Sequence, residues 1–90
     1  MPKSIVLLAT LEGWRHSVRT VDGGMHCGRL THIPVNADPA EARAAAAAMV
    51  IGLAQDFHRT RVDVTWDPPG KPGYWNAQVT VADPPPNTFG

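Results

Sequence analysis

The side chains with the most reactive chemistry in this sequence are one cysteine and four histidines. Imidazole and thiolate are natural ligands of zinc, and the candidate ligands are His26, Cys27 and His32, with His16 or His58 as a further one. Their spacing matches no standard zinc finger. On an extended strand His26 and His32 lie about 20 Å apart, so one ion cannot contact both without a turn between them. A small metal-dependent protein is therefore one alternative, but no metal ligand or cofactor is predicted.

Cys27 is also a candidate nucleophile, because a neighbouring imidazole can activate a thiol. An enzyme of this kind also needs an oxyanion site and a pocket, and the sequence marks neither. A single small cysteine in a strand is more typical of a protein core. The segment Asp22-Gly23-Gly24 separates two predicted strands and does not open a helix, so it does not match a phosphate-binding loop. We therefore predict no catalytic residue, and a thiol-dependent protein stays an alternative.

Three arginines in the first third of the chain form a candidate nucleic-acid-binding face. Arg15 and Arg19 are four residues apart in a predicted strand and so share one side of it, and Arg29 lies in the next strand. Residues 1–33 carry four cations, Lys3, Arg15, Arg19 and Arg29, against two anions, Glu12 and Asp22. Such a face can contact phosphates or an acidic protein, and binding to nucleic acid would be weak and salt-dependent. The alternative is an ordinary solvated sheet face.

A stiff loop, residues 68–73, joins the last two predicted strands and is flanked by aromatic residues. A stiff loop loses little entropy on binding, and Trp and Tyr are enriched at interface hot spots. We therefore predict that Lys71, Tyr74 and Trp75 contact a protein partner. Trp66, in the strand before the loop, is predicted to lie in the core.

The composition is that of one small folded domain. The chain has 90 residues, of which 43% are hydrophobic and 18% are charged. A chain of this length buries only about 60 to 65% of its unfolded surface, which favours a homodimer. The formal net charge is 0, so no strong global attraction to nucleic acid or to an anionic membrane is expected.

The number of cysteines and the length of the apolar runs indicate the cellular compartment of the protein. One cysteine cannot form an intramolecular disulfide, and the apolar run over residues 5–9 is far too short to span a bilayer or to serve as a secretory signal. We therefore predict a cytoplasmic protein. Six arginines against two lysines, with abundant Ala, Gly and Pro, indicate a high-GC bacterial coding sequence.

Apolar periodicity predicts five strands and one helix. The strands are expected over residues 4–11, 14–21, 25–33, 61–67 and 74–82. The first is apolar throughout and should be central and buried on both faces. In the second, Trp14, His16 and Val18 share a face, and Asp22-Gly23-Gly24 supplies a hairpin turn.

The helix is expected to run from Pro39 to about Phe57 or His58. Asp38 is the predicted N-cap and Glu41 completes a capping box. Its buried stripe is expected to contain Met49, Val50, Leu53 and Phe57, extended by Ala42 and Ala46. The predicted fold is α+β, with this single helix packed on a mostly antiparallel five-stranded sheet in the order β-β-β-α-β-β. The domain covers residues 1–82, and 83–90 form a Pro-rich flexible tail.

Residues 4–66 resemble the HicB-like antitoxin domain in arrangement. The resemblance rests on a Trp-containing hairpin over 13–21, a Gly-containing strand at Cys27-Gly28-Arg29, and an Asp-capped helix that begins with a Glu-Ala pair over 38–42. It implies a bacterial protein that binds a partner toxin. Many such domains carry a separate C-terminal DNA-binding segment, whereas this sequence ends in a hairpin and a Pro-rich tail and lacks the Pro-Gly-Cys type turn.

We therefore predict a non-catalytic protein-interaction module, an inhibitor, antitoxin-like or accessory factor that is homodimeric. An exposed sheet edge can offer unpaired backbone groups to a partner strand. Nucleic-acid binding through Arg15, Arg19 and Arg29 is the alternative of a different class.

Overall fold

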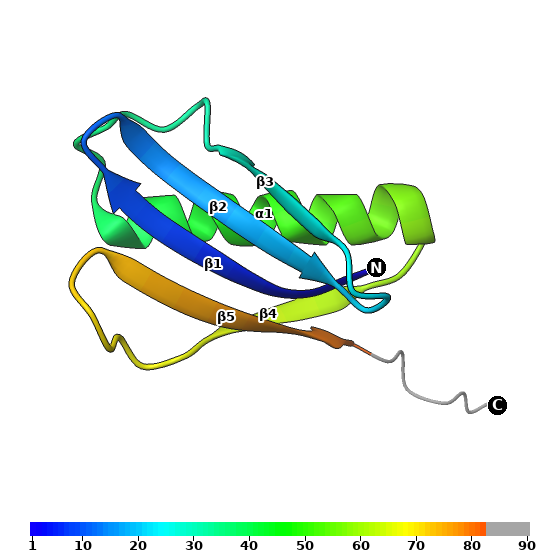
Figure 1. Cartoon of the computed structure of the whole chain (residues 1–90). Helices are drawn as coiled ribbons and strands as arrows, with labels where there is room; N and C mark the ends of the chain where they lie inside the picture. The colour runs from blue at the N-terminus through cyan, green and yellow to red at the C-terminus, as the bar shows by residue number, and fades with distance from the viewer. Residues whose placement is uncertain (83–90) are drawn as a thin grey trace, which may run out of the picture.

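The predicted elements form with nearly the expected bounds. The computed structural model describes residues 1–82, and the predicted tail over 83–90 lies outside them. The elements are β1 (Pro2–Thr10), β2 (Gly13–Thr20), β3 (Met25–Arg29), α1 (Pro39–His58), β4 (Val62–Trp66) and β5 (Tyr74–Val81). All strands pair antiparallel in the order β3-β2-β1-β5-β4, and α1 lies behind the sheet in Figure 1. The predicted α+β class and the order β-β-β-α-β-β are confirmed.

The apolar strand β1 is central, as its sequence predicts. Ile5 and Leu7 face α1 and are fully buried. Val6 and Leu8 point to the opposite side, which α1 does not cover and which we call the open face. They are only half-buried there. The expected burial of this strand on both faces is therefore complete only on the helix side.

Asp22 holds the tight turn between β2 and β3. The Thr20 hydroxyl and the Gly24 N–H both donate to its carboxylate, the latter at 3.4 Å. These hydrogen bonds lower the pKa of Asp22. Gly23 has a φ of 91°, in the region that glycine adopts without strain. The predicted hairpin turn is confirmed.

The third strand is shorter than predicted. β3 ends at Arg29, although the Leu30 N–H still donates to the Trp14 carbonyl at 2.9 Å. The expectation of a strand to residue 33 is wrong because residues 31–37 turn away from the sheet to reach the start of α1. Pro34, in this segment, has no N–H to donate to a ladder.

Proline begins α1 as expected, but the predicted side-chain cap is wrong. Asp38 is the N-cap by position, and its carbonyl accepts from the Ala42 N–H at 3.1 Å. Its carboxylate makes no capping hydrogen bond. Pro39 occupies the first turn and lacks an N–H, so one of the amides that a cap would satisfy does not exist. At the other end, Arg59 adopts a left-handed conformation with φ 50° and ends the helix.

Small residues, rather than large ones, form the buried stripe of α1. The fully buried positions follow four-residue spacing: Ala42, Ala46, Val50 and Ala54. Leu53 and Phe57 were expected in this stripe, but their exposed fractions are 36% and 75%. Alanines allow the helix backbone to approach the sheet closely, and this shifts the larger side chains out of the contact. The predicted stripe is therefore wrong at its C-terminal end.

Candidate interaction surfaces

The three predicted arginines lie together on the open face. Arg15 is directly opposite Arg29 across β2 and β3, and Arg19 is opposite Met25. Residues directly opposite in an antiparallel pair point to the same side, as do residues two and four apart in one strand. The register thus brings all three guanidinium groups to one face.

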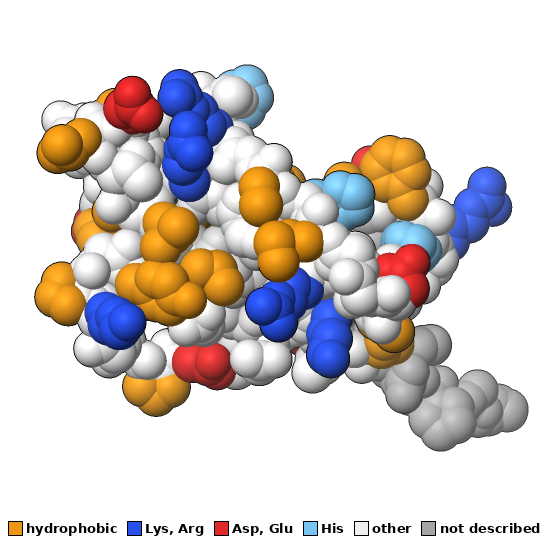
Figure 2. Space-filling view, viewed as in Figure 1, with side chains coloured by type: hydrophobic (Ala, Val, Ile, Leu, Met, Phe, Trp, Pro, Cys, Tyr) orange, Lys and Arg blue, Asp and Glu red, His pale blue; other side chains and the backbone are white. Residues whose placement is uncertain are grey.

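A row of side chains crosses the open face through this arginine pair. In register, Tyr74 of β5 pairs with Leu8 of β1, which pairs with Arg15, which pairs with Arg29. Figure 2 shows this face, with basic side chains beside a patch of hydrophobic ones. The predicted partner contact Tyr74 and the predicted nucleic-acid contacts therefore share one surface.

Charge is unevenly distributed over the open face. The arginines lie on the β2–β3 side, whereas Asp63 and Asp67 lie on and just after β4 at the opposite edge. Asp67 accepts a hydrogen bond from the Gln78 amide at 3.3 Å. Arg29 forms an exposed ion pair with Glu12 at 3.8 Å. The open face is therefore basic at one margin and acidic at the other.

The three residues predicted to contact a partner near the loop do not all point to the same side of the sheet. Lys71 is exposed and forms an isolated β-bridge with Tyr74. Trp75 points to the helix side, where its ring lies 5.5 Å from that of Trp14 at an interplanar angle of 43°. Trp75 thus packs against the core, while Lys71 and Tyr74 are the more accessible of the predicted contacts. Trp66 also packs against the core.

The structure does not bring Cys27 and the histidines together. His26 and Cys27 are neighbours in β3 and therefore point to opposite sides of the sheet, whereas His32 lies in the turn beyond it. The exposed Cys27 thiol donates to the Ser17 hydroxyl at 3.6 Å. Over residues 1–82, no three metal-ligating side chains converge. The geometry therefore offers no support to the metal or thiol alternatives.

His16 lies on the helix side, directly opposite Gly28. Its Nδ1 is buried and has no hydrogen-bond partner in residues 1–82. Burial lowers the pKa of His16 because it disfavours the charged imidazolium. This histidine is therefore placed for packing in its neutral form.

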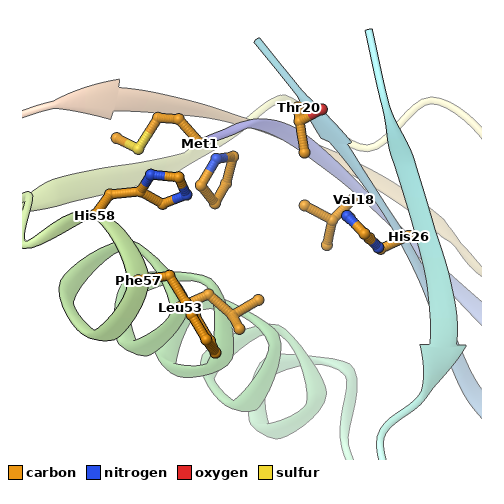
Figure 3. Close-up of a pocket in the computed structure, with 8 residues that line it drawn as sticks. Met1, Val18, Thr20, His26, Leu53, Phe57 and His58 are labelled. Atoms are coloured by element: carbon orange, nitrogen blue, oxygen red, sulfur yellow. The ribbon is translucent and has the colours of Figure 1, made fainter. Parts of the chain in front are cut away.

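A cavity of about 390 Å³ lies between the C-terminal half of α1 and the sheet. In Figure 3, Leu53 and Phe57 of α1 lie on one side of it, and Val18 and His26 of β2 and β3 lie on the other. Met1, Pro2, Thr20 and His58 complete its lining. Sequence periodicity missed this surface because it places every large apolar residue of a helix in the core. The run of alanines over 44–48 was the available signal that the core contact uses small side chains.

Within residues 1–82 no helix has the length and apolar character that crossing a membrane requires. A comparison of the chain with family models, curated proteins and solved structures found no match.

Proposed function

We propose that this protein is a non-catalytic protein-interaction module, an inhibitor, antitoxin-like or accessory factor, that pairs through the edge strand β3. The observation that carries the proposal is the exposed edge of β3, where every residue except Gly28 is exposed. In Figure 1, β3 lies at the outer margin of the sheet. Such an edge is a template for an added strand.

The hydrogen-bond pattern defines which backbone groups of β3 are free. Thr20 donates to the Gly24 carbonyl and Leu30 donates to the Trp14 carbonyl, both at 2.9 Å. Bonded pairs alternate with unbonded ones in an antiparallel ladder. The outward N–H and C=O groups are therefore those of three residues: Met25, Cys27 and Arg29. The middle residue of this set is Cys27.

A second copy of the chain can supply the added strand, which makes the module a homodimer. Antiparallel pairing of two β3 strands about Cys27 places Met25 opposite Arg29 of the other copy, so no like charges oppose each other. It also places His26 opposite Gly28 of the other copy, which carries no side chain to meet the ring directly, although the His16 ring lies beside that position. Both helices then lie on the same side of one continuous ten-stranded sheet.

Proline substitution tests this edge specifically. The Cys27 N–H points away from β2, so Cys27→Pro removes a donor to a partner strand without removing one from the sheet. We expect light scattering to report a dimer for the unmodified protein and for the matched control Cys27→Ala, and a folded monomer for Cys27→Pro. A monomeric unmodified protein, or a dimeric Cys27→Pro variant, would contradict the proposal.

A charge variant tests the same register if Cys27→Pro does not fold. Met25→Glu places a carboxylate opposite Arg29 of the other copy, and Met25→Lys places a second cation there. The pair occurs twice in the symmetric dimer, so we expect Met25→Glu to tighten self-association and Met25→Lys to weaken it, each by up to about thirtyfold. Adding Arg29→Gln to Met25→Glu should abolish the gain. Equal dissociation constants for both Met25 variants would argue against this register.

The cavity beside β3 offers a site for an apolar side chain of a different protein partner. Leu53 and Phe57 are large apolar side chains exposed at its margin, and buried apolar anchors supply much of the energy of protein interfaces. We expect Leu53→Ser with Phe57→Ser to release a co-purifying partner that Ile51→Ser retains, because Ile51 is exposed but does not line this cavity. Retention by both variants would remove the cavity from the proposal.

A further inference from the structure

Arg15 and Arg29 form a like-charge pair that the fold holds in place. They occupy an unbonded position of the β2–β3 ladder, where opposite Cα atoms lie about 4.5 Å apart and side chains are closest. Like charges directly opposite in a sheet are destabilising. Glu12 offsets the charge of Arg29 but not that of Arg15, through a solvent-exposed ion pair at 3.8 Å. The pair therefore favours an anion between the two guanidinium groups.

A shallow depression of about 290 Å³ lies at this pair. Leu8, Ser17, Cys27 and the two arginines contribute to its lining. The Cys27 thiol donates to the Ser17 hydroxyl oxygen, which leaves the hydroxyl proton of Ser17 free to donate to a ligand. Guanidinium and hydroxyl donors are the groups that proteins use to bind phosphate oxygens.

An aromatic side chain stands at the other end of the same row. Tyr74 is half-buried and lies two strands from Arg15, with Leu8 between them. Two strand spacings amount to about 9.6 Å. The row therefore combines a phosphate-binding pair with an apolar and aromatic platform on which a base can stack.

We infer that the open face binds single-stranded nucleic acid, with a phosphate between Arg15 and Arg29 and a base against Leu8 and Tyr74. Arg19 lies on the same face, four residues or about 13.5 Å along β2 from Arg15, and contacts a further phosphate. Asp63 and Asp67 at the opposite margin repel the second phosphate backbone of a duplex. The site uses side chains of the open face, including Arg29 and Cys27 of β3, whereas the proposed pairing uses the outward backbone groups of the same strand.

The number of arginines in the site determines how steeply its affinity for nucleic acid falls with salt concentration. Three arginines that neutralise three phosphates of a single strand give a slope of about −2 in the logarithm of affinity against the logarithm of salt concentration. Binding should consequently be detectable near 20 mM salt and be lost by several hundred millimolar.

Fluorescence anisotropy with a labelled oligothymidylate of twelve nucleotides tests the site. We expect Arg15→Gln with Arg29→Gln to weaken binding at least tenfold, and Tyr74→Leu to weaken it about fivefold or more. The matched control is Arg43→Gln with Arg59→Gln, which removes two charges on and just after α1, away from the open face, and should change affinity less than twofold. Urea titrations confirm that each variant folds.

Two further ligands test whether the site prefers a single strand to a duplex and to free phosphate. A duplex of equal length should bind more weakly than the single strand, and inorganic phosphate should compete only at millimolar concentration. Equal affinity for the duplex, equal losses in the control variant, or no binding at 20 mM salt would overturn the inference. These outcomes are distinguishable from failure of the proposed function, because light scattering reads the β3 edge separately.

Discussion

The His16 ring lies over Gly28, its cross-strand neighbour on the helix side of the sheet. A Cβ on residue 28 would lie 3.1 Å from Cε1 and Nε2 of His16. This distance is shorter than an ordinary van der Waals contact, so a side chain at position 28 and the imidazole at position 16 compete for the same volume. Glycine at position 28 thus accommodates the histidine of the next strand.

Gly28→Val should destabilise the protein through this contact. We expect a loss of about 1 kcal/mol in the free energy of unfolding, because the added side chain displaces the His16 ring. In a His16→Ala background the same substitution should be neutral or stabilising, since valine is favoured in strands. Urea denaturation of the four variants gives the coupling, which we expect at about 1 to 2 kcal/mol. Additive effects would show that the two positions do not compete.

His16 should make stability depend on pH. Burial lowers its pKa in the folded protein below the ordinary value of 6.5, so the unfolded chain binds more protons as pH falls. Stability is therefore full above about pH 6.5 and decreases below it, toward the lowered folded pKa. We expect the urea midpoint to fall between pH 7.5 and 5.5 and the fall to be smaller in His16→Asn. The control is Ser17→Ala, which changes the next residue of β2 without removing a titratable group and should keep the original profile.

Because α1 lies close to the sheet, a larger side chain should destabilise the protein at a buried position of the helix but not at an exposed one. Ala46 is fully buried, whereas Ala48, half a turn away on the same helix, is exposed. Ala46→Leu should cost about 1 to 3 kcal/mol because the core has no space for it, and Ala48→Leu should stay within about 0.5 kcal/mol. Thermal and urea unfolding measure both. Equal effects would show that helix propensity, and not packing, sets the cost.

Local patterning predicted the elements well but not which surface of α1 meets the sheet. The apolar run of β1, the alternation in β4 and the glycine turn after β2 are each determined by neighbours in sequence, and all three formed as expected. Which residues of α1 are buried depends on how closely the helix approaches the sheet. The spacing of apolar residues in the sequence does not reveal this distance. Leu53 and Phe57 consequently lie at a cavity margin and not in the core.

The candidate sites depend on strand register in the same way. Alternation within β2 was enough to place Arg15 and Arg19 on one side. It did not predict that Arg29 lies opposite Arg15 or that Tyr74 joins their row, because these relationships follow from the pairing of β3 and β5. Asp38 was the natural cap by residue type, yet its carboxylate makes no capping bond. Sequence spacing thus identified side chains, while pairing across strands determined their neighbours.

Replacing one arginine of the opposed pair by an acid should stabilise the protein. Arg15→Glu converts the repulsion with Arg29 into an attraction across the ladder, and we expect a gain of about 0.2 to 1 kcal/mol in the free energy of unfolding. Arg19→Glu is the control, because Arg19 lies opposite the uncharged Met25 and should gain less. Urea titrations at 20 mM and 500 mM salt measure both variants. Since both partners are exposed to solvent, the difference between the variants should shrink at the higher salt concentration. An unchanged difference would mean that the gain arises from packing or strand propensity and not from charge, and it would weaken the argument that the pair favours an anionic ligand.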